Sequence, residues 1–289
     1  MDARPEVFIE RALPYGRQGV EIAIAVTATV YDKHSRYGHI LVLDTEFFGR
    51  ILVIDGILQT TVSDEFVYHE MLALAAAVRH GAPRTALIVG GGDGGALRQV
   101  LRMSTVESVV QVEIDPVVVE VSRTYLPEVS GGGYDDPRTS LVLGDGAEFV
   151  ARTRDRYDLV VLDLTDPLPD SPAERLFETD FLARCRDVLT PGGVLSLQCG
   201  SLTFQPDEVA TMYRRVAGLF DHVALHHAVV PGYQLTSFGF LLAADRAQPG
   251  DAALAAAFDR IAGTSGYLSP ETYHSSRVLP PYLRHLTDG

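Results

Sequence analysis

Residues 87–98 read LIVGGGDGGALR, an apolar strand that runs through a glycine-rich turn into a helix without a break. Glycines allow positive φ angles and close approach of a ligand, and the first turn of the helix offers free N–H groups. This pattern is typical of a nucleotide-binding turn. A carboxylate, Asp93, stands inside the turn, where it would repel a phosphate and attract a cation. The stretch therefore predicts a nucleotide-type site that favours a positively charged ligand.

The composition of the 289-residue chain is that of a globular protein, with 46% hydrophobic and 21% charged residues. The net charge of −14 argues against nucleic acid as a partner and is compatible with a polycationic substrate, although many proteins are acidic for solubility alone. Cys185 and Cys199 form neither a disulfide framework nor a metal-binding spacing, which predicts buried thiols and a cytoplasmic location. No stretch approaches the roughly 20 apolar residues of a membrane span, so we expect no membrane association.

Short apolar runs separated by turn residues fill the segment from residue 7 to about 58. Examples are EIAIAV at 21–26 and HILVLD at 39–44. Such runs predict a small antiparallel β unit of hairpins, and we place a first domain at residues 1–62. A unit this small cannot hide all its strand edges, which favours self-association.

A helix is predicted over residues 64–80, with Ser63 as its N-cap, acidic residues in its first turn and Gly81 after its end. Residues four apart share a helix face. The pairs are Asp64 with Tyr68, and Glu65 with His69.

An alternation of strands and helices follows, with strands expected at 85–89, 108–113, 139–143, 159–163 and 194–198. It predicts an α/β fold in which residues 63–289 form a Rossmann-like, doubly wound, mostly parallel sheet with a helical C-terminal extension from residue 249. Ligands of such sheets bind at the carboxyl ends of the strands. Carboxylates stand at four of these ends: Asp93, Glu113 with Asp115, Asp145, and Asp163.

Two of these positions suit a nucleoside. Glu113 lies 20 residues beyond Asp93 at the end of the next strand, where a carboxylate typically accepts from both ribose hydroxyls. The same spacing would also suit a nicotinamide enzyme. Asp145 and Gly146 follow the next strand, where they either meet an adenine amino group or form a tight turn.

A pair of carboxylates, Asp163 and Asp166, leaves the sheet three residues apart and ahead of Pro167. In a cleft, such a pair can hold an ammonium group and withdraw its proton. An alkyl amine with a pKa of about 10 must lose that proton before its nitrogen can attack carbon. The alternative is a solvated Asp-Pro turn.

Several motifs together carry a family resemblance. They are DGILQT at 55–60, DEFVYHEM at 64–71, GGGDGG at 90–95, EID at 113–115, YDDPR at 134–138 and DLTDP at 163–167, with looser matches in PAERLF at 172–177 and PGY at 231–233. Through them the chain resembles the polyamine aminopropyltransferases, the spermidine and spermine synthase family, from about residue 36 to 244.

The resemblance implies transfer of an aminopropyl group from decarboxylated S-adenosylmethionine to a small-molecule amine, with release of methylthioadenosine. It also implies a fold of the S-adenosylmethionine-dependent methyltransferase type, a homodimer or homotetramer, and neither a metal nor a permanently bound cofactor. Asp163 resembles the base that deprotonates the amine, and Tyr68 the residue that orients it. The other implied contacts are His69, Asp166 and Tyr233 for the acceptor, and Asp93, Glu113, Asp145, Gly146, Gln59 and Pro172 for the donor.

The chain also departs from the family pattern. Gly38 stands where family members commonly carry a donor-contacting glutamine, and the chain has no tryptophan. Leu164 replaces a small polar residue, and the connection at 168–171 is longer than in putrescine-using members, as in the thermospermine synthase branch. The acceptor therefore stays open among putrescine, cadaverine, agmatine, spermidine and more specialised amines.

Two other functions fit parts of the sequence. One is a methyltransferase that uses intact S-adenosylmethionine on the same fold. The other is a non-catalytic relative that binds polyamine or methylthioadenosine.

Overall fold

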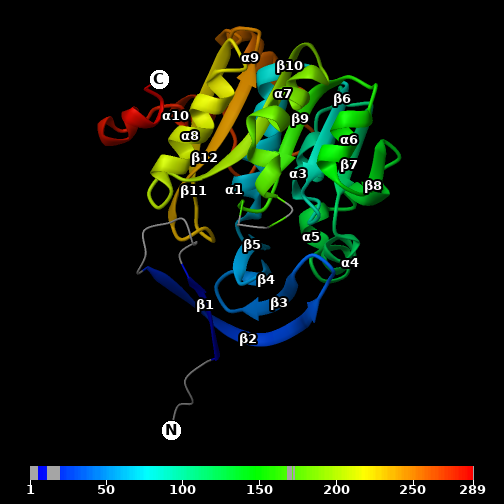
Figure 1. The fold of residues 1–289 in the computed structure, drawn as a ribbon, viewed down its shortest axis with the longest axis vertical. Coiled ribbons are helices and arrows are strands. Elements are labelled where there is room, and N and C mark those ends of the chain that lie inside the picture. Colours follow the sequence, from blue (N-terminus) through cyan, green and yellow to red (C-terminus); the bar gives the residue numbers. More distant parts are fainter. Residues whose placement is uncertain (1–5, 12–19, 168–170, 172, 289) are drawn as a thin grey trace.

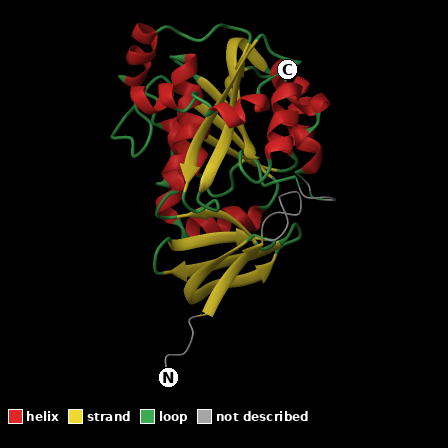
Figure 2. Ribbon diagram, turned by 90° about the vertical axis from the view of Figure 1, so that its left-hand side faces the viewer, coloured by secondary structure: helices red, strands yellow, loops and turns green. Residues whose placement is uncertain are grey.

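The computed structural model describes residues 6–11, 20–167, 171 and 173–288. Within these ranges the chain forms a small sheet near the N-terminus and a larger sheet flanked by helices (Figure 1). Seen from the side, the small sheet lies below the helix-covered sheet, and the chain ends in the upper part (Figure 2).

The small sheet is an antiparallel meander in which each strand pairs with the next along the chain. Its strands are β1 Glu6–Arg11, β2 Glu21–His34, β3 His39–Thr45, β4 Gly49–Ile54 and β5 Ile57–Thr61. Alternate residues of a strand point to opposite faces. Ile40, Val42 and Leu52 accordingly pack against helices α4 (Pro116–Tyr125) and α5 (Pro127–Ser130), which joins the small sheet to the rest of the molecule.

The larger sheet has seven strands in the order β11-β12-β10-β9-β6-β7-β8. They are β6 Thr85–Gly90, β7 Ser108–Glu113, β8 Thr139–Leu143, β9 Tyr157–Asp163, β10 Leu189–Ser201, β11 His222–Val230 and β12 Thr236–Ala244. Strands β10, β9, β6, β7 and β8 are parallel, and β11 and β12 add an antiparallel edge. The predicted α/β fold, with a Rossmann-like sheet of the methyltransferase type behind a small antiparallel unit, is confirmed.

Helices cover both faces of this sheet, so its central strands are buried on both sides. In β6, Ala86 and Ile88 face one layer, whereas Leu87 and Val89 face the other. The first layer consists of α1 Glu65–His69, the π-helical turn η1 Glu70–Leu74, α2 Ala75–His80, α3 Gly95–Leu101, α9 Asp251–Phe258 and α10 Pro270–Ser275. The second consists of α6 Gly146–Arg152, α7 Thr179–Asp187, α8 Pro206–Ala217 and the short turns η3 Glu174–Phe177 and η4 Pro281–Leu286, while η2 Gly133–Asp135 precedes β8.

The predicted helix over residues 64–80 exists, but two details of the prediction are wrong. Asp64, not Ser63, is the N-cap residue, and its carboxylate accepts hydrogen bonds from Thr61 Oγ1 and from the N–H of Gly232 instead of capping the helix. The helix is also divided by η1 directly after His69. Such π turns often occur at functional sites. The end at Gly81, with φ of +98°, is as expected.

Two further expectations concern the chain as a whole. Cys185 and Cys199 are buried free thiols, as predicted. Across the described residues, no helix combines the length and the apolar character needed to cross a bilayer.

Candidate active site

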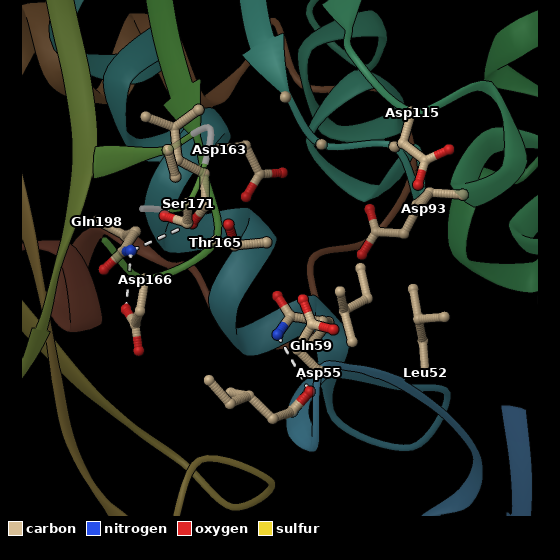
Figure 3. Close-up of a pocket in the computed structure, with 18 of the residues that line it drawn as sticks. Leu52, Asp55, Gln59, Asp93, Asp115, Asp163, Thr165, Asp166, Ser171 and Gln198 are labelled. Carbon is tan, nitrogen blue, oxygen red and sulfur yellow. Dashed lines mark hydrogen bonds between the residues drawn. The ribbon is translucent and has the colours of Figure 1, made fainter. Parts of the chain in front are cut away.

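A cavity of about 450 Å³ lies where the carboxyl ends of β6, β7 and β9 face strands β4 and β5 (Figure 3). Nine predicted site residues line it: Gln59, Tyr68, Asp93, Glu113, Asp145, Gly146, Asp163, Asp166 and Tyr233. His69 does not line it, and Pro172 lies outside the described residues, as do residues 168–170. Among the described lining residues there are eight carboxylates and no Lys, Arg or His side chain. The cavity therefore suits a ligand with several positive charges.

The glycine-rich turn wraps closely around the end of β9. The N–H of Gly91 donates to the carbonyl oxygen of Asp163 over 2.8 Å. Gly91 has φ of +67°, and a Cβ there would lie 2.7 Å from Asp163 Oδ2. At the other end of the turn, the N–H of Gly95 donates to Asp93 Oδ1 over 2.9 Å. A side chain at Gly91 would thus displace the carboxylate of Asp163, which explains the glycine.

At the end of β9, the two carboxylate oxygens of Asp163 differ in their hydrogen bonds. Tyr68, from α1, donates its hydroxyl proton to Asp163 Oδ1 over 2.8 Å. No hydrogen bond from the described residues reaches Oδ2, although this atom is buried. Burial raises the pKa of Asp163 to about 6, and nearby Asp93 adds to this, whereas His69 and the Tyr68 hydroxyl lower it. A carboxylate with a raised pKa and an oxygen that accepts no hydrogen bond is a candidate general base.

Asp166 is held by a residue that the sequence analysis did not single out. Gln198, on β10, donates from Nε2 to Asp166 Oδ1 and to the carbonyl oxygen of Leu164, both over 3.2 Å (Figure 3). Burial raises the pKa of Asp166 to about 6, and the bond from Gln198 lowers it. The second carboxylate of the predicted pair therefore stands in the cavity wall with a fixed orientation, not in a solvated turn.

Glu113 and Asp145 end neighbouring strands but have different surroundings. Glu113 accepts from the N–H of Asp115 over 2.9 Å, and burial raises its pKa to about 7. Asp145 is the N-cap of α6, where Oδ1 accepts from the N–H groups of residues 147 and 148, while Oδ2 pairs with Arg175. A Cβ at Gly146 would lie 2.3 Å from Val89, so this helix start requires glycine. The carboxylate of Asp145 is thus already used twice within the protein.

One wall of the cavity contains residues of both sheets, and Tyr233 in the β11–β12 connection contacts β5 there. Tyr233 donates its hydroxyl to the carbonyl oxygen of Gln59, and its ring meets that of Tyr68 edge to face at 5.4 Å. Glu10, on β1, also lines the cavity and accepts from the N–H of Leu58 over 3.0 Å. Burial raises the pKa of Glu10 to about 7 despite hydrogen bonds from Leu58 and Gln234. A carboxylate of the small sheet therefore contributes to the site.

His69 stands behind Asp93 rather than in the cavity wall. Its Nδ1 lies 2.7 Å from Glu65 Oε2, and its Nε2 lies 3.4 Å from Asp93 Oδ2 and 3.9 Å from Asp163 Oδ2. Burial alone would lower the pKa of His69, but Asp93 and Glu65 raise it well above its ordinary value. Both ring nitrogens face carboxylates, so the imidazolium form satisfies both. The contact of His69 with the acceptor stays a prediction.

His69, Asp93 and Asp163 also bring possible metal-ligand atoms within 4.8 Å of one another. An imidazolium has no free lone pair for a metal ion. The arrangement accordingly favours the histidine itself as the cation among these carboxylates.

Sequence reasoning missed Glu10, Gln198 and the contact of His69 with Asp93. Glu10 lies in a strand far from the recognised motifs, and Gln198 is one polar residue in an apolar strand. Gln198 lies in a stretch that is otherwise buried, whereas Glu10 is buried in a strand whose Val7 and Ile9 are exposed, so the two share no local signal. Such residues become visible only when separate segments are placed together.

Comparisons with known proteins agree with this geometry. Residues 65–249 match the model of the spermine/spermidine synthase domain, and residues 7–62 match that of the spermidine synthase tetramerisation domain. The chain is 41% identical over 216 residues to polyamine aminopropyltransferase 1 of Pseudomonas aeruginosa, covering 75% of each chain. It is 38% identical over 247 residues to the polyamine aminopropyltransferase of Sodalis glossinidius, covering 84% of this chain and 85% of that one.

The chain is also similar in structure to solved spermidine synthases. A spermidine synthase in complex with the transition-state analogue AdoDATO superposes with a TM-score of 0.90 at 28% identity, covering 99% of this chain and 96% of the other. Spermidine synthase from Thermotoga maritima gives 0.88 at 28% identity, with 99% and 95% covered. Because the two family models together match residues 7–62 and 65–249, and a curated relative that covers 75% of the chain is 41% identical to it, the chain belongs to the spermine/spermidine synthase family of aminopropyltransferases.

Proposed function

We propose that this chain transfers the aminopropyl group of decarboxylated S-adenosylmethionine to an amine acceptor and releases methylthioadenosine. The observation that carries the proposal is Oδ2 of Asp163, which accepts no hydrogen bond from the described residues and is buried at the edge of the acidic cavity while Tyr68 holds the other oxygen. This is the arrangement that a general base for an amine requires.

The glycine-rich turn supports the choice of donor. Asp93 stands where the tail of a nucleoside held by Glu113 would end, and in decarboxylated S-adenosylmethionine that tail is a bare ammonium. The intact compound carries a carboxylate there, which Asp93 and Asp163 would repel. Gln59, Asp145, Gly146 and Pro172 complete the proposed donor site. For Asp145 this requires an adenine contact in addition to, or in exchange for, its pairing with Arg175.

The proposed reaction is a single displacement. The amine nitrogen attacks the methylene carbon beside the sulfonium sulfur, the carbon–sulfur bond breaks, and its electron pair leaves with sulfur as a neutral thioether. Asp163 takes the proton of the attacking ammonium. The pKa of an ordinary aspartate lies about 6 units below that of an alkyl amine. Because the pKa of Asp163 is raised to about 6, the free-energy cost of moving the proton from the amine to Asp163 is about 3 kcal/mol smaller. The protein otherwise aligns the reactants and excludes water.

The far end of the cavity supports an acceptor with a second positive charge. Asp166, fixed by Gln198, and Glu10 provide carboxylates there, and Tyr233 lines the passage beside them. Charge-assisted hydrogen bonds from an ammonium to such groups are the strong ones in proteins. We propose that the acceptor is a diamine or a longer polyamine, with Leu164 in the wall between donor and acceptor ends.

The experiment combines the purified protein with decarboxylated S-adenosylmethionine and a panel of amines, and follows methylthioadenosine and new polyamines by mass spectrometry. Asp163→Asn should abolish turnover and leave donor binding, measured by calorimetry, largely unchanged. Near-normal turnover in this variant would contradict the assignment of the base. Equal binding of intact S-adenosylmethionine by the wild type would contradict the assignment of the donor.

The two parts of the chain have separate proposed roles. We propose that residues 1–62 assemble the chain into a homodimer or homotetramer and that residues 63–289 form the catalytic domain. The match to a tetramerisation domain supports this, as do Val7 and Ile9 of β1, which are 46% and 47% exposed. Sedimentation analysis of the wild type and of Ile9→Glu would test it, since the charged variant should dissociate. The cytoplasmic location stays a prediction.

A further inference from the structure

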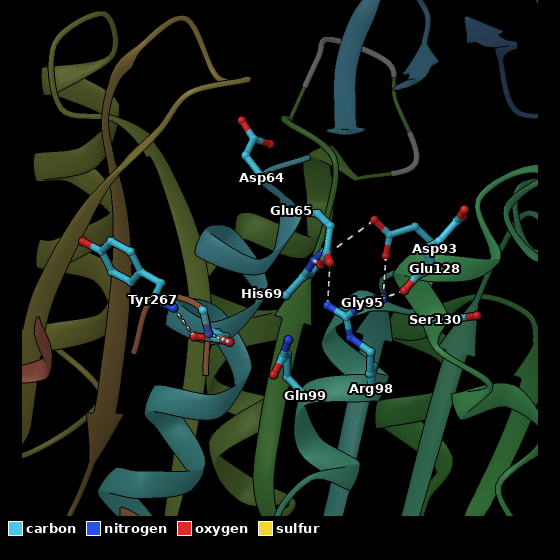
Figure 4. A network of polar contacts seen from close by, with 12 residues as sticks. Asp64, Glu65, His69, Asp93, Gly95, Arg98, Gln99, Glu128, Ser130 and Tyr267 are labelled. Carbon is cyan, nitrogen blue, oxygen red and sulfur yellow. Dashed lines mark hydrogen bonds and ion pairs between the residues drawn. The ribbon is translucent and has the colours of Figure 1, made fainter. Parts of the chain in front are cut away.

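A row of alternating charges connects the surface of helix α3 with the cavity (Figure 4). Arg98 donates from one guanidinium nitrogen to Glu65 Oε1 over 2.5 Å, and Glu65 Oε2 lies 2.7 Å from His69 Nδ1. His69 Nε2 in turn faces Asp93 Oδ2 at 3.4 Å. Of these four, only Asp93 lines the cavity.

We propose that Arg98 and Glu65 are positioning residues that, through His69, keep Asp93 ionised and aimed at the tail of the donor. The proposal rests on the function proposed above, in which Asp93 holds the ammonium of the donor. It assigns to two residues outside the cavity a part in the choice between decarboxylated and intact S-adenosylmethionine.

Because the side chains of this row are largely buried, each charge in it needs its neighbour of opposite sign. The side chains of Glu65, His69 and Asp93 are 6%, 2% and 11% exposed, whereas that of Arg98 is 25% exposed. A charge that leaves water at such a site needs a partner of opposite sign. Without Glu65, His69 would lose its proton more easily, and Asp93 would face a neutral ring and would itself take up a proton more easily. Without Arg98, buried Glu65 would lose its cation, and Asp93 would lose a nearby positive charge that lowers its pKa.

Hydrogen bonds and packing contacts of the glycine-rich turn also hold Asp93, His69 and Arg98 in fixed positions relative to one another. The N–H of Gly95, the first residue of α3, holds Asp93 Oδ1, and Arg98 lies one turn further along that helix. A Cβ at Gly95 would lie 2.1 Å from the ring of His69, so the ring is packed directly against the turn. Arg98 also donates to the carbonyl oxygen of Glu128 over 2.8 Å, which fixes its position. A change in this row therefore acts on one oxygen of Asp93 while the other stays bonded.

The chain offers a matched control one turn further along. Arg102, the C-cap residue of α3, pairs with Glu70, the first residue of η1, over 3.1 Å, and neither residue lines the cavity. Arg102→Gln thus removes an ion pair between the end of α3 and the turn that follows His69, but leaves the row to Asp93 intact.

The test is a comparison of donor affinities by calorimetry with the full-length protein. For wild type, Arg98→Gln, Glu65→Gln, Arg98→Lys and Arg102→Gln, the dissociation constants of decarboxylated and of intact S-adenosylmethionine are measured, with thermal melting to check folding. We expect Arg98→Gln and Glu65→Gln to reduce the preference for the decarboxylated donor about tenfold or more, since Asp93 would no longer be held ionised and in place to accept the charge-assisted hydrogen bond of the donor ammonium. Arg98→Lys should restore part of that preference, and Arg102→Gln should keep all of it.

Two failures can be told apart. If the wild type does not prefer the decarboxylated donor, the proposed function fails, and this inference fails with it. If the wild type has that preference and Arg98→Gln and Glu65→Gln keep it, the inference alone is wrong. Equal losses in Arg98→Gln and Arg102→Gln would assign the row a general structural role and would overturn the inference as well.

Discussion

Removal of the Tyr68 hydroxyl tests the assignment of Asp163 as the base. Tyr68 donates to Asp163 Oδ1 over 2.8 Å, and this bond lowers the pKa of a carboxyl group that burial raises to about 6. A hydrogen bond to a charged group contributes about 1.5–3 kcal/mol, and 1.36 kcal/mol corresponds to one pKa unit. In Tyr68→Phe we therefore expect the pKa of Asp163 to rise by about one to two further units.

The sign of the effect on activity follows from the role of the base. Asp163 accepts a proton only when it is ionised, so activity is lost as the pH falls through its pKa. In Tyr68→Phe this loss should occur at higher pH than in the wild type. The measurement is the pH dependence of kcat/KM for the donor, which reports the groups of the free enzyme. The other groups that face Asp163 and influence it are His69 and Asp93.

Tyr233→Phe is the matched control for this experiment. It removes another buried phenol hydroxyl from the same cavity wall, but that hydroxyl donates to the carbonyl oxygen of Gln59 and not to Asp163. In the pH profile of kcat/KM, the loss of activity at low pH should occur at the same pH in Tyr233→Phe and in the wild type. An acidic limb of Tyr68→Phe that stays in place, or moves to lower pH, would refute the reasoning.

Three further predictions test other parts of the site. Glu10→Gln should raise the KM of acceptors with a second ammonium group about tenfold, because it removes a charge-assisted hydrogen bond, and an equal effect on a monoamine would contradict this. Donor binding at pH 6.5 should release protons, because a cation favours the ionised form of carboxylates with raised pKa values, here Asp163 and Glu113. Calorimetric enthalpies that are identical in buffers of different ionisation enthalpy would exclude such release. Gly38→Ala should lower the free energy of unfolding by about 1 kcal/mol, because its Cβ would lie 2.5 Å from Asp55 Oδ2 while Asp55 Oδ1 holds the N–H of His39, and an unchanged urea midpoint would argue against this cost.

The parallel part of the fold was predictable because its signals are local. Strands β7 and β8 have the predicted bounds, and β6 and β9 differ from theirs by one or two residues. Apolar runs followed by turn residues and amphipathic helices determine these elements without distant contacts. β10 is longer than predicted because its first residue, Leu189, already pairs with Tyr157 of β9 before a register shift at Val194.

The helix over residues 64–80 shows where local signals end. Ser63 is a good N-cap by residue type, but Asp64 takes that place because its carboxylate is bonded to Thr61 and Gly232. The π turn that follows His69 coincides with Glu70, whose carboxylate accepts from the N–H groups of residues 266–268. The N-cap at Asp64 and the π turn at Glu70 each involve a partner distant in sequence, namely Gly232 and residues 266–268. The pattern of residues within the helix therefore does not predict either of them.

The candidate site divides in the same way. Carboxylates at the ends of parallel strands must meet at one edge, so topology alone places Asp93, Glu113 and Asp163 together. Glu65 was paired with His69 by helical spacing, and the 2.7 Å contact between them agrees with that spacing. The position of His69, behind Asp93 and against Gly95 of the glycine-rich turn, depends on how α1 packs against α3. Spacing along one helix carries no information about that packing.

The proposed donor and acceptor ends of the cavity consequently differ in how much their residues can vary without damage to the fold. The donor end is built from strand–turn–helix units, where Gly91 and Gly146 leave no room for side chains and Asp145 caps a helix, so most substitutions there would also damage the fold. The acceptor end draws single side chains from four separate segments, among them Glu10 on β1 and Gln198 on β10. A substitution such as Leu164 changes that wall without disturbing an element. Acceptor choice can therefore vary among chains that share the donor turn, which is why the motifs indicate the donor more firmly than the amine.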